Sequence, residues 1–141
     1  MLYDSAFGQS GLEASLIFNK DDKVRAGIKG DFRTFNTSNL AHNFNMPGTK
    51  VDLWASYNFA KKVWVSTEIF LYGNRVMSLD SMDAPINQGI VADINLSADY
   101  RFTERISIFL ELNNILGNDW QRWYNYRATP FNVKAGATFA F

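Results

Sequence analysis

The chain of 141 residues has no cysteine, one histidine and no long hydrophobic run. The lack of cysteine excludes a disulfide scaffold and thiolate chemistry. The lone His42 excludes a histidine cluster, and we take it as an ordinary loop residue. No run approaches 18 apolar residues, so no membrane-spanning helix is predicted. The 14 basic and 14 acidic side chains cancel, so a nucleic-acid partner is not expected.

The chain does contain segments in which apolar and polar residues alternate, and one of these segments ends the chain. Residues 131–141 place apolar side chains at every second position, which is the period of a β-strand. About eleven residues is long for a strand in a soluble domain, but it is enough to cross a bilayer at a tilt. The apolar face of this segment carries Phe131, Val133, Ala135, Ala137, Phe139 and Phe141.

The end of the chain resembles the C-terminal signal of bacterial outer-membrane β-barrels. That signal has a polar residue, a glycine two residues later, an aromatic residue three further on, and a terminal phenylalanine. Here Lys134, Gly136, Phe139 and Phe141 occupy those positions. The resemblance implies recognition by the barrel-assembly machinery, and a last strand that closes a barrel in the outer membrane.

Six further segments alternate in the same way, and short turns and long loops follow one another in strict order between them. This pattern predicts an all-β fold: an antiparallel, up-and-down transmembrane β-barrel, that is, a meander. Residues 1–141 are predicted to form one barrel segment with seven to eight strands. Residues 1–9 are predicted to be a loop or a weak strand. The predicted strands are 11–19, 24–33, 50–59, 63–72, 90–102, 106–113 and 131–141, and the long loops are 37–48, 74–88 and 117–130.

Aromatic residues on the apolar face gather at one end of the predicted strands, just before a short turn or the terminus. The interior of a soluble barrel gives no reason for such banding, whereas a bilayer interface favours amphipathic rings. We therefore predict that the apolar face meets lipid. A soluble barrel that binds a lipid inside is the alternative. The predicted interface girdle is Phe18, Tyr57, Phe59, Tyr100 and Phe102, followed by Phe139 and Phe141.

The opposite face is charged, and the lipid interpretation places it in an aqueous lumen. A lysine or arginine facing lipid at the bilayer midplane would cost roughly 2–4 kcal/mol. We expect cross-strand ion pairs in this lumen; binding of a substrate or a plug domain is the alternative role. The candidate lumen-lining residues are Arg25, Lys29, Arg33, Glu68, Asp93, Asp99, Arg101 and Glu111, together with Glu13, Asp31, Lys50, Asp52 and Lys134.

Residues 110–141 resemble the end of a TonB-dependent receptor barrel. In that family an Asn-Leu/Ile segment ends the penultimate strand, as Asn113-Asn114-Ile115-Leu116 would here, and aromatic residues such as Trp120 and Trp123 follow. The sequence departs from the family at Thr129-Pro130-Phe131, where Pro-Gly-Arg is usual. The resemblance implies the C-terminal part of a barrel of about 22 strands around a plug.

By this resemblance the parent protein is a receptor for nutrient uptake, and the upstream strands and the plug are missing from the chain. Met1-Leu2-Tyr3-Asp4 is unlike a secretory leader, so we expect a mature form or a fragment. A complete small eight-stranded outer-membrane barrel with a structural or adhesive role is the second hypothesis. The soluble lipid-binding barrel is the third.

Candidates for chemistry are few, and we predict neither catalysis nor a cofactor. Asp80, Asp83 and Asn87 do not follow the spacing of a calcium loop. Glu68 and Glu111 lack an accompanying nucleophile or oxyanion site. The densest aromatic and basic cluster has two interpretations: stacking a sugar ring or binding a polyanion, or else loop packing and an outer-leaflet girdle. Its members are Trp120, Arg122, Trp123, Tyr124, Tyr126 and Arg127.

Overall fold

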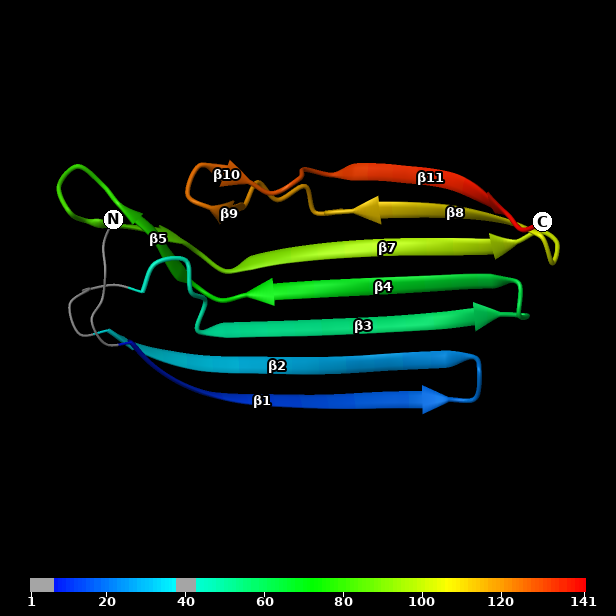
Figure 1. The fold of residues 1–141 in the computed structure, drawn as a ribbon, viewed down its shortest axis with the longest axis horizontal. Coiled ribbons are helices and arrows are strands. Elements are labelled where there is room, and N and C mark those ends of the chain that lie inside the picture. Colours follow the sequence, from blue (N-terminus) through cyan, green and yellow to red (C-terminus); the bar gives the residue numbers. More distant parts are fainter. Residues whose placement is uncertain (1–6, 38–42) are drawn as a thin grey trace.

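The computed structural model describes residues 7–37 and 43–141, and these form an open, all-β sheet with two small hairpins (Figure 1). Seven long strands pair in the order β1-β2-β3-β4-β7-β8-β11, each antiparallel to the next. The predicted fold class, an antiparallel meander that is part of a larger barrel, is confirmed. The long strands are β1 (Phe7–Lys20), β2 (Val24–Thr37), β3 (Thr49–Phe59), β4 (Val63–Tyr72), β7 (Val91–Arg101), β8 (Ile106–Asn113) and β11 (Asn132–Phe139).

The observed strands lie where the alternation predicts them, with differences at their ends. Strands β4 and β8 have the predicted bounds. Strands β1 and β2 are 14 residues each and extend several residues further toward the long loops. Residues 7–9, predicted to be loop or weak strand, belong to β1. Residues 1–6 and His42 lie outside the described residues.

Two of the long loops contain hairpins that the alternation of apolar and polar residues does not predict. The loop after β4 holds β5 (Arg75–Leu79) and β6 (Pro85–Gln88), and the loop after β8 holds β9 (Gln121–Trp123) and β10 (Tyr126–Arg127). These strands are too short to produce a clear period of two. Polar residues and a proline within them also resemble an ordinary loop.

The short turns all lie at one end of the sheet, opposite the long loops, and the C-terminus lies with them (Figure 1). The β3–β4 turn has Ala60 and Lys61 at φ values of 51° and 58°, and the Lys62 amide donates to the Phe59 carbonyl at 3.0 Å. Two central residues at positive φ form a type I′ turn, whose twist matches that of the flanking strands.

The register of the sheet keeps the apolar positions of all seven strands on one face. One row of facing residues runs across five strands as Leu16, Ile28, Leu53, Ile69 and Ile94. On the other face Lys29 is opposite Asp52, and Lys134 is opposite Glu111. Because side chains alternate with a period of two, this register preserves the predicted division into an apolar and a charged face.

The apolar face is uncovered, so the sheet has no central hydrophobic core. Among the described residues, the buried hydrophobic side chains are Met77, Val91 and Trp120, which lie near or within the long loops. The chain exposes 10263 Å², whereas a compact soluble protein of this mass would expose about 7,400 Å². No described segment is a helix long and apolar enough to span a membrane.

On the charged face, two aromatic rings lie over glycines of the neighbouring strand. A Cβ added at Gly27 would approach a ring carbon of Trp54 to 2.5 Å, and one at Gly136 would approach the ring of Phe109 to 2.6 Å. Both pairs are directly opposite in the register. These glycines therefore leave space in which a large ring lies against the sheet.

We expect Gly136→Ala to lower the free energy of unfolding by about 1–3 kcal/mol, because the new methyl group must displace the Phe109 ring. The midpoint of urea unfolding in lipid vesicles measures this effect. Gly89→Ala is the matched control, since no atom lies within 4 Å of a Cβ at that position. The double variant Gly136→Ala/Phe109→Leu should recover part of the loss. Equal midpoints for the two alanine variants would contradict the steric explanation.

Candidate functional site

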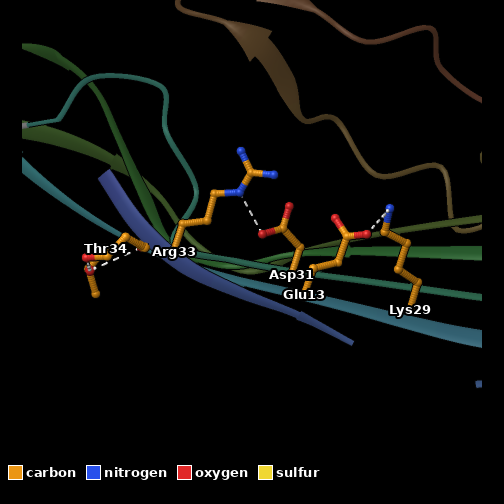
Figure 2. A network of polar contacts seen from close by, with 6 residues as sticks. Glu13, Lys29, Asp31, Arg33 and Thr34 are labelled. Carbon is orange, nitrogen blue, oxygen red and sulfur yellow. Dashed lines mark hydrogen bonds and ion pairs between the residues drawn. The ribbon is translucent and has the colours of Figure 1, made fainter. Parts of the chain in front are cut away.

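Three ion pairs join charged side chains of the polar face. Lys29 Nζ lies 3.1 Å from Glu13 Oε1, and Arg33 Nε lies 2.7 Å from Asp31 Oδ1. Figure 2 shows these four side chains on the same side of strands β1 and β2, with Thr34 on the opposite side. In the third pair, Lys134 and Glu111 are 3.7 Å apart between β11 and β8. The charged side chains thus share one face, as the alternation requires.

The predicted ion-pair network is present only in part. The other charged residues of this face make no ion pair within 4 Å among the described residues. The register explains this for most of them, because it places uncharged residues beside them. Lys50 and Asp52 instead lie opposite Asp31 and Lys29, which pair with Arg33 and Glu13. Glu68, for example, lies between Trp54 and Asn95, and Asp99 lies between Trp64 and Phe109. The unpaired residues are Arg25, Lys50, Asp52, Glu68, Asp93, Asp99 and Arg101.

The predicted girdle residues all lie exposed on the apolar face near the short turns. Tyr57 and Phe59 form one edge-to-face pair, with ring centroids 4.3 Å apart, and Tyr100 and Phe102 form another at 6.3 Å. Phe18 is likewise exposed. Their common height follows from the register, which places Val63 between Phe59 and Tyr100.

The length of β3 suits a strand that crosses the apolar band of an outer-membrane barrel at the usual tilt. Phe32, an exposed aromatic residue at the long-loop end, is opposite Thr49, the first of the 11 residues of β3. At about 3.3 Å per residue, β3 extends roughly 33 Å to Phe59. A strand tilt of about 40° reduces this length to a height of about 25 Å, which matches the apolar band of outer-membrane barrels.

The residues of the assembly signal divide between the two faces of β11 and its end. Lys134 and Gly136 lie on the polar face. Lys134 pairs with Glu111, and Gly136 lies under the ring of Phe109. Phe139 and Phe141 are exposed. The Ala140 amide donates to the Arg105 carbonyl at 2.9 Å, which holds the end of the chain against the last short turn.

At the other end of the sheet, a buried arginine joins the two hairpin-containing loops. Arg75 is 8% exposed. Its Nη2 donates to the side-chain oxygen of Gln88 and to the main-chain carbonyl of Gln121, and its guanidinium carbon lies 5.9 Å from the Trp120 ring centre. The Trp120 ring in turn lies 5.6 Å from that of Tyr72. The loops after β4 and β8 are thus packed together.

Burial lowers the pKa of Arg75 from its usual value of 12.5. An arginine remains charged at neutral pH despite such a shift, because its ordinary pKa is so high. The buried cation is stabilised by carbonyl oxygens and an aromatic face, and no carboxylate pairs with it among the described residues. No pattern in the sequence predicts this arrangement, since Arg75 lies in a short hairpin without clear alternation.

The loop after β8 and the adjoining ends of the sheet line an open cavity of 480 Å³, which we call the loop pocket. Its lining residues come from β7, β8 and β11 and from the loop that holds β9 and β10. The lining residues are Asp93, Asn95, Asn113, Asn114, Trp120, Arg122, Trp123, Tyr126, Arg127, Ala128, Thr129, Asn132 and Lys134.

Asn114 holds both ends of this loop. It is 2% exposed and has a φ of 50°, a left-handed conformation that asparagine tolerates better than most residues. Its Nδ2 donates to the carbonyls of Asn118 at 3.0 Å and Thr129 at 3.2 Å. Its backbone amide donates to Asn95 Oδ1 at 3.0 Å. The asparagine that carries part of the family resemblance therefore has a defined structural role.

The predicted aromatic and basic cluster is divided by the structure. Trp120 is buried between the loops, whereas Trp123 and Tyr126 are 60% and 72% exposed at the rim of the loop pocket. Arg127 pairs with Asp119 at 2.9 Å. In the other hairpin, Asp80 Oδ1 accepts the amides of Met82 and Ala84 and so shapes a turn.

Comparisons with known proteins place the fold among outer-membrane receptors. No protein-family model matches the chain, and no curated protein matches it. The pyoverdine outer membrane receptor FpvA of Pseudomonas aeruginosa PAO1, bound to pyoverdine, superposes with a TM-score of 0.80 at 16% identity over 96% of this chain and 22% of that one. FpvA bound to a heterologous pyoverdine gives 0.81 at 16% identity, over 94% and 19%.

A mutant of the ferric enterobactin receptor PfeA from the same organism gives a TM-score of 0.73 at 12% identity, over 93% of this chain and 22% of the receptor. The chain thus spans about a fifth of the length of the solved receptors that it matches. At these identities the likeness establishes the fold. The chain has the fold of part of an outer-membrane receptor barrel, and the resemblance inferred from the sequence is confirmed at that level.

Replacing Asn114 with alanine should loosen the loop pocket. The variant leaves two carbonyls without their donor, at about 1–3 kcal/mol each, and places alanine in a left-handed conformation for about 1 kcal/mol more. We expect limited proteolysis within residues 114–129 to become at least about tenfold faster. Asn125→Ala is the matched control, because Asn125 also has a positive φ of 64° but is exposed. Equal proteolysis of both variants would contradict this role of Asn114.

Proposed function

We propose that this chain forms the last strands of an outer-membrane receptor barrel that takes up a nutrient. In this proposal the apolar face meets outer-membrane lipid and the charged face lines the lumen. The observation that carries the proposal is the uncovered apolar face of a seven-stranded sheet whose two edge strands run in the same direction and so do not form an antiparallel pair.

The edge strands β1 and β11 run in the same direction, because an odd number of strands alternates between them (Figure 1). An up-and-down barrel closes through antiparallel neighbours, so the described strands require further strands to form one. Unpaired edges also expose backbone donors and acceptors, which the lipid phase does not tolerate. These considerations favour missing barrel strands over a complete small barrel.

The uncovered apolar face also argues against a soluble lipid-binding barrel, which would enclose that face. Rows of exposed Leu, Ile and Phe side chains would be unfavourable in water, and they match the height of a bilayer instead. The girdle residues would then lie at the periplasmic interface. The final strand would end on the same side, beside the short turns.

Nutrient uptake driven through TonB is the activity that best fits the resemblance of residues 110–141. The superposed structures include receptors described as bound to pyoverdine and a receptor for ferric enterobactin. By analogy, the charged face of this chain would surround a plug domain, and the long loops would face the outside of the cell. The barrel-assembly machinery would recognise the final strand. We assign no enzymatic activity to the chain.

The orientation of the two faces can be tested with single cysteines, because the chain has none of its own. Leu110 and Glu111 are neighbours in β8 on opposite faces. We expect a cysteine at Leu110 to resist a water-soluble maleimide at least about tenfold better than a cysteine at Glu111 in outer membranes. Urea denaturation should make the two equally reactive. Faster labelling at Leu110 than at Glu111 would contradict the proposed orientation.

Deleting Phe141 should impair assembly, because the terminal aromatic residue completes the assembly signal. Heat-modifiable mobility on gels and surface labelling of cells measure the folded, inserted fraction. Phe131→Leu is a control for loss of an exposed aromatic residue elsewhere on the last segment. We expect the folded, inserted fraction to drop severalfold for the deletion and to stay unchanged for Phe131→Leu. Unchanged insertion after the deletion would refute the assignment of Phe141 to the assembly signal.

A further inference from the structure

The loop pocket contains buried polar atoms that have no partner within the protein. Asn114 Oδ1, Trp120 Nε1 and Asp93 Oδ1 make no hydrogen bond among the described residues. Asn114 and Trp120 are 2% and 6% exposed, and all three residues line the pocket. Leaving a buried polar atom unpaired costs about 1–3 kcal/mol. Such atoms are few in native proteins. Seven occur among the described residues, and three of the seven belong to residues that line this one cavity, where a bound ligand would pair with them.

The unpaired atoms include both a donor and acceptors. The Trp120 indole N–H only donates, whereas the Asn114 carbonyl and the Asp93 carboxylate accept. A hydroxyl group matches such a mixture because it donates one hydrogen bond and accepts others. A ligand with several hydroxyls therefore matches all three atoms in its chemistry, and because the atoms are buried, its binding requires lining side chains of the pocket to move toward it.

The charges of the pocket are balanced, which argues against a strongly charged ligand. Arg122 acts electrostatically on Asp93, Arg127 pairs with Asp119 at 2.9 Å, and Lys134 pairs with Glu111 at 3.7 Å. A polyanion would meet the Asp93 carboxylate, and a polycation would meet the arginines. A neutral ligand meets neither repulsion.

Two flat aromatic side chains stand at the rim of the pocket. Trp123 and Tyr126 are exposed and belong to the facing strands β9 and β10. Their rings have electron-rich faces that attract the weakly positive C–H groups of a sugar ring. The cavity of 480 Å³ also lies within the range of about 300–1,000 Å³ that is usual for ligand sites.

From these features we propose that the loop pocket binds a neutral, hydroxyl-rich ligand, namely a short oligosaccharide. Asp93, Asn114 and Trp120 would hydrogen-bond its hydroxyls, and Trp123 would stack on a ring. The inference rests on the proposed function, since it takes the charged face to line an aqueous lumen that the ligand enters from the loop side.

The test uses the natural full-length protein, purified in detergent and shown to be a folded barrel by its heat-modifiable mobility. Titrations with maltotetraose, cellotetraose and xylotetraose are followed by tryptophan fluorescence and calorimetry. Sucrose octasulfate and spermidine serve as the polyanion and the polycation. We expect at least one neutral tetrasaccharide to bind more tightly than either charged probe.

The variant Asp93→Leu should weaken that binding by about tenfold or more, because it removes a charged acceptor. The matched control is Asp99→Leu. Asp99 lies on the same face of β7 and also lacks an ion pair, but it does not line the pocket. We expect the control to change the affinity less than twofold. Trp123→Ala should weaken binding and reduce the fluorescence change.

Tighter binding of sucrose octasulfate or spermidine than of any tetrasaccharide would overturn the proposal. An equal loss of tetrasaccharide affinity in Asp93→Leu and Asp99→Leu would also overturn it. Absence of tetrasaccharide binding at millimolar concentration to a heat-modifiable barrel would overturn only the ligand assignment. A protein that is monomeric and soluble without detergent would instead overturn the proposed function, whatever it binds.

Discussion

The whole sheet depends on a shared phase of alternation in seven strands. In each hydrogen-bonded pair of strands, the residues of the apolar face lie opposite one another and the charged residues lie on the other face. A shift of one residue in any pair would turn Asp93 or Lys29 toward the apolar side and Ile94 or Ile28 toward the polar side. In lipid, each misplaced charge would cost several kcal/mol near the midplane, so the environment itself selects the register.

The strand bodies were predictable from the sequence because each one carries this alternation over eight or more residues. The predicted bounds of β4 and β8 agree with the observed bounds at both ends of each strand. The extension of β1 and β2 was not predictable in this way. Beyond Arg33 the alternation of β2 ends, because Phe35 falls on the face that carries the charges and Thr34 and Asn36 fall on the apolar face. Only the pairing of the backbones, such as Ser10 with Thr34, identifies this part as strand.

The candidate site was less predictable than the sheet. The aromatic and basic residues around the loop pocket are recognisable as a cluster in the sequence. Their separation into a buried Trp120 and an exposed rim is not predictable from it. That separation depends on Arg75, which lies about forty-five positions away in sequence and reaches the Gln121 carbonyl. Contacts between loops leave no periodic signal. The positive φ of Asn114 agrees with its residue type, because asparagine tolerates this conformation. Nothing near Asn114 in the sequence indicates its hydrogen-bond partners, such as the Thr129 carbonyl.

The rings that lie over Gly27 and Gly136 affect the dimensions of the interior. A tryptophan or phenylalanine that projects from a barrel wall narrows the space inside by most of its own length. Trp54 and Phe109 instead rest flat against neighbouring strands, where a glycine provides room. On the face that we assign to the lumen, these two bulky residues therefore thicken the wall only slightly and leave space for whatever occupies the interior.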